Sequence, residues 1–243
     1  MKVLVVDDEP PARARLRALV DEIGGAEVVA EAASGLQALE LAQTLEPEVV
    51  LLDIRMPGMD GVEVARHLSR LPRPPAVVFT TAYEAHALAA FEVHAVDYLL
   101  KPIRKERLAE ALARVRQRRP RETYDAFADP GSVRTHVSAV QHGRLRLVAV
   151  GEVRYFLADQ KYVAAGFPGG ELLLEESLRQ LETELGERFL RVHRNALVAM
   201  AHVEALEREA DGLFRVRLQG VPVRPAISRR LLAAVRQRLR NGR

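Results

Sequence analysis

One stretch constrains the fold of this chain more than any other, residues 49–61, with the sequence VVLLDIRMPGMDG. Its first four residues are apolar without alternation, which is typical of a strand buried on both faces of a parallel sheet. The run ends on a carboxylate, Asp53, and a Met-Pro-Gly turn follows. In an open α/β sheet, the carboxyl ends of the strands open into the binding crevice. We therefore expect Asp53 on a rigid strand, with its side chain at the mouth of a site.

The first 118 residues alternate between apolar strand patterns and amphipathic helix patterns. The strand patterns cover residues 2–6, 26–31, 49–53, 76–79 and 96–100, and the helix patterns cover residues 10–23, 34–45, 60–70, 84–91 and 104–118. Ser34 and Asp60 each precede a Gln or Glu by three residues, which is the spacing of a helix capping box. This alternation predicts an α/β fold with a doubly wound parallel sheet.

Chemically active side chains follow four of these strands: Asp7 and Asp8, Asp53, Thr81, and Lys101. We expect them to meet at one edge of the sheet, where three carboxylates repel each other and favour a hard cation. Mg²⁺ fits best, because it takes few carboxylates and leaves positions for phosphate oxygens. A carboxylate nucleophile, metal carboxylates, a hydroxyl and a Lys are what phosphoryl transfer to an Asp requires.

These residues closely resemble the receiver domain of two-component response regulators, which has a flavodoxin-like fold. The resemblance covers residues 1–118 and implies that Asp53 accepts a phosphoryl group from a sensor histidine kinase. The alternative is that Asp7, Asp8 and Asp53 merely end the strands of an ordinary flavodoxin-like domain. Structural α/β domains rarely place so many complementary groups at one edge.

The same resemblance implies a role for each further residue at this edge. Asp8 would bind Mg²⁺ directly, Asp7 would hold a metal-bound water, and the Arg55 carbonyl would complete the protein ligands together with Asp53. Thr81 would hydrogen-bond the phosphoryl group, and Lys101 would neutralise it. Tyr98 matches the aromatic residue that moves inward on activation.

Charge and composition separate the two halves of the chain. Residues 1–118 carry 15 Lys and Arg against 18 Asp and Glu, whereas residues 119–243 carry 21 against 15. An acidic part joined to a basic part suggests cation binding in the first and polyanion binding in the second. The chain has no Cys, which excludes disulfides, thiolate catalysis and Cys-bound zinc. Without an apolar stretch of membrane length or a leader-like N-terminus, we expect a cytoplasmic protein with no membrane partner.

Residues 119–136 mix charge, Pro, Gly and Ser without a sustained period, which predicts a linker before a second domain at residues 137–243. The second domain is expected to be mainly β. Its predicted strands cover residues 145–150, 153–157, 162–167, 172–174 and 214–218. Two further stretches, residues 189–200 and 202–207, are expected to be extended. The dipeptide Asp211-Gly212 is a hairpin turn signal. Ser177 begins one predicted helix, and a final helix is expected directly after Ser228.

This half resembles the LytTR DNA-binding domain in the order and spacing of its motifs. They are EVRYFL (152–157), KYV (161–163), SLRQLE (177–182), FLRVHRNALV (189–198) and ISR (227–229). That family has an elongated β fold and inserts loops into successive major grooves of double-stranded DNA. By resemblance, the residues that would face DNA are Gln160, Lys161, Arg194, Asn195, Arg229 and Arg230.

The residue types suit this role, since Arg contacts guanine or phosphate and Asn reads adenine. Asn195 departs from the Ser that is more usual in the family, which puts its own contact in doubt. A solvated basic surface is the alternative for Gln160, Lys161, Arg194, Arg229 and Arg230. The outer arginines of the last helix, including Arg236, are expected to be solvated or in loose contact with phosphate.

Together the two resemblances imply a LytR/AlgR-type response regulator that controls transcription. Phosphorylation of Asp53 would promote a homodimer and so change sequence-specific DNA binding. An enzymatic output is disfavoured, because residues 119–243 show no phosphate loop, paired-carboxylate site or metal-ligand pattern. A protein-binding or RNA-binding output remains the alternative, although aromatic residues are only 5% of the chain.

Overall fold

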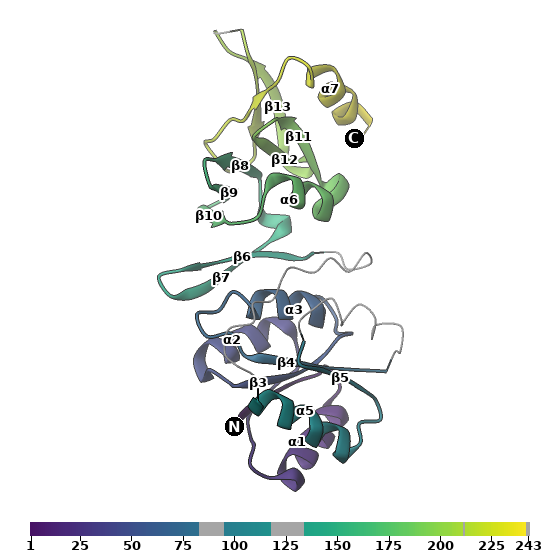
Figure 1. Ribbon diagram of the computed structural model, residues 1–243. Coiled ribbons are helices and arrows are strands. Elements are labelled where there is room, and N and C mark those ends of the chain that lie inside the picture. Colours follow the sequence, from purple (N-terminus) through teal and green to yellow (C-terminus); the bar gives the residue numbers. More distant parts are fainter. Residues whose placement is uncertain (83–94, 118–133, 211, 242–243) are drawn as a thin grey trace. The chain divides into compact units, whose positions relative to one another are not determined.

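The computed structural model describes residues 1–82, 95–117, 134–210 and 212–241. The chain divides into two compact units (Figure 1). The first contains residues 1–132 and 140–145, and the second contains residues 133–139 and 146–243. Among the described residues, none of the helices is both long enough and apolar enough to cross a membrane.

The first unit is a five-stranded parallel sheet covered by helices on both faces. The strand order is β2-β1-β3-β4-β5, with strands β1 (Lys2–Val6), β2 (Glu27–Ala32), β3 (Val49–Asp53), β4 (Ala76–Thr81) and β5 (Asp97–Leu100). The helices α1 (Pro10–Ile23) and α5 (Lys105–Gln117) cover one face, and α2 (Gly35–Leu45) and α3 (Gly61–Leu68) cover the other (Figure 1). The doubly wound α/β fold is thus confirmed. The helix predicted at residues 84–91 lies outside the described residues.

Strand β3 lies in the middle of the sheet, and it is buried over its whole length because helices cover both faces. One core cluster joins inward residues of three neighbouring strands, such as Val5, Leu51 and Val78, to α1 and α5. The helix residues in this cluster are Leu16, Leu19, Val20, Leu108, Ala111 and Leu112. A strand packed on both faces cannot use the alternating pattern of a half-exposed strand, which is why residues 49–52 are apolar without interruption.

Local signals account for where the helices of this unit begin. The Ser34 side chain accepts a hydrogen bond from the Gln37 amide (3.4 Å), and the Asp60 side chain accepts one from the Glu63 amide (2.8 Å). Both caps were predicted from the sequence. The Gln37 side chain, however, reaches Ala33 N rather than Ser34 N. Helix α3 ends at Leu68, two residues before the predicted end.

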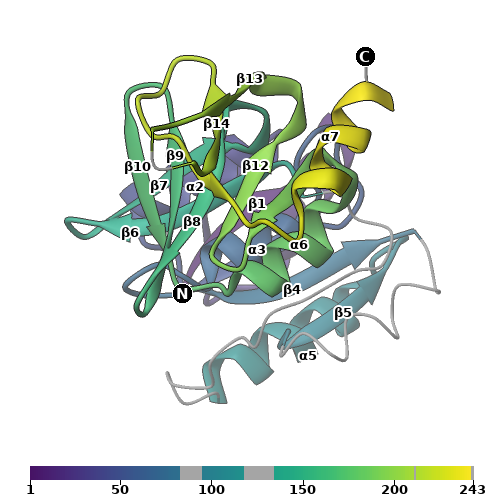
Figure 2. The ribbon, with the colours of Figure 1, turned by 90° about the horizontal axis from the view of Figure 1, so that it is seen from above.

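The second unit is built on a five-stranded antiparallel sheet in the order β10-β9-β8-β12-β11. Its strands are β8 (Tyr155–Asp159), β9 (Tyr162–Phe167), β10 (Gly170–Leu174), β11 (Phe189–His193) and β12 (Ala196–Ala199). Figure 2 shows β8, β9 and β10 running side by side. A second sheet contains β13 (Val203–Arg208), β14 (Phe214–Leu218) and β15 (Ala226–Ile227). The described helices of this unit are α6 (Leu178–Leu185) and α7 (Leu232–Asn241). Three short 3-10 turns are described as well: η1 (Val150–Glu152), η2 (Gly186–Arg188) and η3 (Met200–His202).

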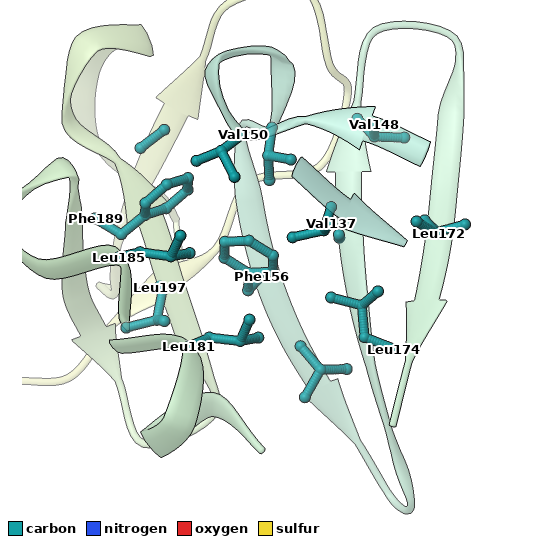
Figure 3. Packing of buried hydrophobic residues seen from close by; sticks show 14 of the residues in the cluster. Val137, Val148, Val150, Phe156, Leu172, Leu174, Leu181, Leu185, Phe189 and Leu197 are labelled. Carbon is teal, nitrogen blue, oxygen red and sulfur yellow. The ribbon is translucent and has the colours of Figure 1, made fainter. Parts of the chain in front are cut away.

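Among the described residues of the second unit, two hydrophobic clusters pack on opposite faces of the five-stranded sheet. In the first, Phe156 of β8 lies among Leu181 and Leu185 of α6 and Phe189 of β11 (Figure 3). In the second, Tyr155 of β8 packs with residues of β14, β15 and α7. Successive residues of a strand point to opposite faces, so Tyr155 and Phe156 divide between the two clusters.

Three features of the chain beyond residue 133 differ from the sequence-based prediction. The stretch 189–200 is not one extended segment but a hairpin of β11 and β12, because β12 pairs with both β11 and β8. The strand β6 (His136–Gln141) was not predicted; it pairs with β7 (Arg144–Ala149) across the turn His142-Gly143. Helix α7 begins at Leu232 rather than directly after Ser228, so Arg229 and Arg230 lie in the preceding turn.

The predicted linker, residues 119–136, falls mostly outside the described residues. Its last three residues are described, and His136 begins β6. Arg134 is 2% exposed, and its guanidinium forms ion pairs with Glu176 (2.7 Å) and Glu184 (3.1 Å). Composition alone could not predict this, because both carboxylates lie more than forty residues further along the chain.

Candidate functional site

Three carboxylates gather where β1 and β3 end. An oxygen atom from each of Asp7, Asp8 and Asp53 lies within 4.8 Å of the others. Asp7 is fully buried and Asp53 is 5% exposed. The turn after β1 is held by Arg13, whose Nη1 donates to the carbonyls of Asp7 (2.7 Å) and Asp8 (3.2 Å). The predicted meeting of these side chains at one edge of the sheet is what the structure shows.

Lys101 completes this cluster from the last strand of the sheet. Its backbone N–H donates to the Thr81 carbonyl (2.7 Å), which extends the pairing of β4 and β5 beyond Leu100. Its Nζ lies 2.7 Å from Asp7 Oδ2 and 2.9 Å from Asp53 Oδ1. One ammonium group therefore bridges two of the three carboxylates.

Burial and charge act against each other at this edge. Burial raises the pKa of the Asp53 carboxyl; Lys101 opposes this shift, while the charges of Asp7 and Asp8 add to it. Burial tends to lower the pKa of the Lys101 ammonium, but its bonds to Asp7 and Asp53 outweigh that effect and raise it. Three carboxylates and one ammonium leave excess negative charge. Hard oxygen donors with excess negative charge are the ligand chemistry that suits Mg²⁺.

Two further predicted residues lie beside the cluster. Thr81, at the end of β4, is 1% exposed, and its side chain hydrogen-bonds the hydroxyl of Tyr98 on the neighbouring strand. Burial and the charge of Asp53 raise the pKa of Tyr98, against the effect of that hydrogen bond. Arg55 donates its backbone N–H to Asp53 Oδ2 (3.1 Å), which fixes the carboxylate relative to the following turn.

The residues predicted to face DNA occupy three turns of the second unit. Gln160 and Lys161 form the turn between β8 and β9, Arg194 and Asn195 form the turn between β11 and β12, and Arg229 and Arg230 lie between β15 and α7. Five of the six side chains are exposed, and Asn195 is partly buried. The Asn195 side chain hydrogen-bonds His193.

Backbone hydrogen bonds bring these three turns to the same end of the five-stranded sheet. The Ala158 amide donates to the Asn195 carbonyl (2.8 Å), which places the second turn beside the end of β8. The Ser228 amide donates to the Val192 carbonyl (2.9 Å), which places the third turn beside the end of β11. Residues separated by about 70 positions in the sequence thus share one exposed end.

Arg236 and Arg191 lie near these turns and make contacts that the sequence analysis did not assign. Arg236 was expected to be solvated or in loose contact with phosphate; it is exposed, and its guanidinium also lies 4.6 Å from the centre of the Phe214 ring, a cation–π contact. Arg191 lies in β11, and its Nη1 donates to the Arg194 carbonyl (3.0 Å). The Arg236–Phe214 contact joins segments about 20 residues apart, and the Arg191–Arg194 contact depends on the direction of the Arg191 side chain, so no local pattern predicts either.

Comparison with known proteins gives two family matches. The family model for the response regulator receiver domain matches residues 3–113, and the family model for the LytTr DNA-binding domain matches residues 143–240. The positive alginate biosynthesis regulatory protein of Pseudomonas aeruginosa is 47% identical, over 98% of this chain and 98% of its own length. The transcriptional regulatory protein BtsR of Salmonella typhi is 36% identical, again over 98% of each chain.

Solved structures match the chain in part. The response regulatory domain of protein mrkE from Klebsiella pneumoniae is 36% identical and covers 48% of this chain and 96% of its own, with a TM-score of 0.45. A LytTr DNA-binding domain from Bacillus cereus is 20% identical and covers 44% of this chain and 97% of its own, with a TM-score of 0.40.

Proposed function

This chain belongs to the response regulators that join a receiver domain to a LytTR DNA-binding domain and control transcription, and we propose that phosphorylation of Asp53 by a sensor histidine kinase controls its binding to DNA. The observation that carries this proposal is the arrangement around Asp53. Asp53 lies at a strand end, beside two further carboxylates and 2.9 Å from the Lys101 ammonium. We assign residues 1–118 to the receiver domain, 119–136 to the linker and 137–243 to the DNA-binding domain.

The donor set fits Mg²⁺, and Asp7, Asp8, Asp53 and the Arg55 carbonyl are the groups that would hold it. Bound there, the cation would supply the positive charge that lets an anionic phosphoryl donor approach a carboxylate. Lys101 adds a second positive charge beside Asp53, with its Nζ 2.9 Å from Asp53 Oδ1. The Asp53 Oδ atoms are held by Lys101 Nζ and by Arg55 N, so the nucleophile is oriented before the donor arrives.

The signal leaves the site through Thr81 and Tyr98. In the structure, the Thr81 side chain pairs with the Tyr98 hydroxyl. A phosphoryl group on Asp53 brings acceptor oxygens that compete for the Thr81 hydroxyl, which frees Tyr98 to take a second position. A local change in hydrogen bonding thereby biases a two-state element on the surface.

Labelling with a small phosphodonor tests the assignment of Asp53. With acetyl phosphate and Mg²⁺, we expect the wild-type protein to gain an acid-stable, base-labile phosphoryl group and Asp53→Asn to gain none. Asp8→Ala should also fail, because it removes a cation ligand. Asp21→Asn, which changes an exposed carboxylate on α1, should label normally. Labelling of the Asp53→Asn variant at the wild-type level would disprove the assignment.

In the second unit, we propose that Arg194 and Arg229 read base edges and that Gln160, Lys161, Asn195 and Arg230 support them. A bidentate Arg–guanine contact is worth about 1–3 kcal/mol of discrimination. Arg194→Ala and Arg229→Ala should therefore weaken binding to a preferred duplex by that amount and to a scrambled duplex much less. Pure phosphate contacts would weaken both duplexes alike and lower the salt slope by about one unit.

Gel shifts at two salt concentrations, on DNA selected from random sequences, measure the difference. Arg240→Ala is the matched control, since Arg240 is an exposed arginine of α7. Arg236 is unsuitable as that control because it stacks on Phe214. Equal losses on both duplexes would leave Arg194 and Arg229 as phosphate anchors.

A further inference from the structure

The turn that carries Arg194 is held from two sides by different parts of the chain. On one side, the Ala158 amide of β8 donates to the Asn195 carbonyl (2.8 Å). On the other side, Arg191 Nη1 donates to the Arg194 carbonyl (3.0 Å). The Arg194 backbone is thus anchored by a side chain three residues earlier, while its own guanidinium is exposed.

Arg191 is itself held in place by an acidic residue of helix α6, which buries one face in the core. Its Nε and Nη2 lie 3.0 and 2.8 Å from Glu182 Oε2. Glu182 belongs to α6, whose Leu178, Leu181 and Leu185 lie in the core shown in Figure 3. Helix α6 packs directly against β11 and β12. The chain of contacts therefore runs from the core through Glu182 and Arg191 to the backbone of Arg194.

The value of this chain of contacts for overall stability is small. The side chains of Arg191 and Glu182 are 24% and 40% exposed, and ion pairs at such positions add little to folding. Its geometric effect is larger, because Arg191 uses all three guanidinium nitrogens in a planar fork that fixes the direction of the Arg194 carbonyl. Side chains that recognise a ligand need supporting residues to hold them to within a fraction of an ångström.

We propose that Arg191 and Glu182 are positioning residues. They orient the β11–β12 turn so that the Arg194 side chain approaches the DNA bases in one fixed direction. This inference rests on the proposed role of Arg194 as a base-reading residue. For Glu182, the proposed role and its charge predict opposite effects on DNA binding. By charge alone, a carboxylate near this end of the unit repels DNA, so neutralising it should strengthen binding to every sequence. As part of the support for Arg194, its loss must weaken binding to the preferred sequence.

The sign of the effect of Glu182→Gln therefore separates the two roles. We expect this variant to bind a preferred duplex about threefold to tenfold more weakly, while binding to a scrambled duplex stays equal or increases. Glu175→Gln is the matched control; it removes the same charge from an exposed position before α6. It should leave the ratio of the two affinities unchanged. A Glu182→Gln variant that behaves like Glu175→Gln refutes the proposal.

A double-mutant cycle shows whether Arg191 acts through Arg194 or touches DNA itself. Arg191→Met keeps the apolar stem and should lower the affinity ratio in the wild-type background. In the Arg194→Ala background it should have no further effect, because the side chain it orients is gone. A loss that persists in that background refutes the positioning role and makes Arg191 a direct contact. Thermal unfolding of each variant checks that the fold is intact.

The failure of the underlying function gives a different result. If Arg194→Ala alone leaves the ratio of preferred to scrambled affinity unchanged, Arg194 does not read bases, and both proposals fail. If Arg194→Ala lowers the ratio but Glu182→Gln does not, only the positioning role fails. Both outcomes come from the same binding measurements on the full chain.

Discussion

At the scale of single residues, Asp53 lies in surroundings that favour the neutral form of its carboxyl. Burial raises its pKa, and the neighbouring Asp7 and Asp8 add to the shift. A carboxyl whose pKa is raised by folding destabilises the folded chain at pH values above that pKa. The cost disappears as the pH falls through the folded pKa toward the usual value. The site thus gives up stability in order to keep three carboxylates together.

We predict that Asp53→Asn stabilises the protein when no divalent cation is present. At pH 7 with a chelator, the free energy of unfolding should rise by about 0.5–2 kcal/mol, the usual range for a single stabilising change. The gain should shrink as the pH is lowered, because the raised pKa of wild-type Asp53 lets it take up a proton in the folded state. Added Mg²⁺ should stabilise the wild type more than the variant, since it binds only the folded state. Urea denaturation measures all three, and a destabilised Asp53→Asn variant at pH 7 contradicts the prediction.

At the scale of elements, the pairing of β8 and β9 places the Tyr155 ring directly over Gly166. Tyr155 pairs with Gly166 across the two strands, and a Cβ added to Gly166 would overlap the Tyr155 ring. Tyr155 is 2% exposed, and its hydroxyl donates to Glu171 of β10 (2.5 Å). A glycine in a strand interior costs backbone entropy. Here it makes room for an aromatic ring that spans three strands.

Gly166→Ala should therefore destabilise the second unit by about 1–3 kcal/mol, the cost of overpacking a filled core. The matched control is Gly151→Ala, where no atom lies within 4 Å of the added Cβ and no positive φ is involved. That change should alter the free energy of unfolding by less than about 0.5 kcal/mol. Equal effects of the two substitutions in chemical denaturation would show that the contact between Tyr155 and Gly166 contributes nothing.

At the scale of the whole molecule, two units with separate cores divide the work. The cluster of carboxylates lies in the first unit, whose half of the sequence is acidic, and the three exposed turns lie in the second, whose half is basic. Phosphorylation in one unit must reach DNA binding in the other. We propose that a symmetric dimer does this, because it would place two DNA-binding units on one duplex and so multiply their affinities.

We predict that a beryllofluoride mimic of the phosphoryl group converts the protein to a homodimer through the face that contains β5 and α5. The helix predicted after Thr81 is also expected there, but it lies outside the described residues. Leu100 of β5 is 42% exposed, and Leu100→Glu should weaken the dimer by placing a charge in its interface. Leu36→Glu on α2, where Leu36 is 46% exposed, is the matched control and should dimerise normally.

Sedimentation velocity measures this shift in mass. A protein that stays monomeric with the mimic, at concentrations that saturate DNA, would rule out dimerisation as the output. A dimer that is equally sensitive to Leu100→Glu and Leu36→Glu would place the interface elsewhere.

The sequence by itself determined the architecture of the first unit and the members of its cluster. An uninterrupted apolar run such as residues 49–52 has few structural solutions, and the helix caps at Ser34 and Asp60 act within four residues. Parallel strands then bring their carboxyl ends to one edge, so Asp7, Asp53 and Lys101 could be expected to meet. Each of these inferences needs only local pattern and a topological rule.

Only the tertiary structure decided how the second unit holds its exposed turns. The chain turns at Arg194 within residues 189–200 because β12 pairs with β8 as well as with β11. The stretch contains no Gly or Pro that would indicate a turn. The Arg236 guanidinium stacks on Phe214, and Arg191 is oriented by Glu182 of α6. These contacts join segments that are distant in sequence or depend on side-chain direction. Propensity and periodicity act over a few neighbouring residues and carry no information about them.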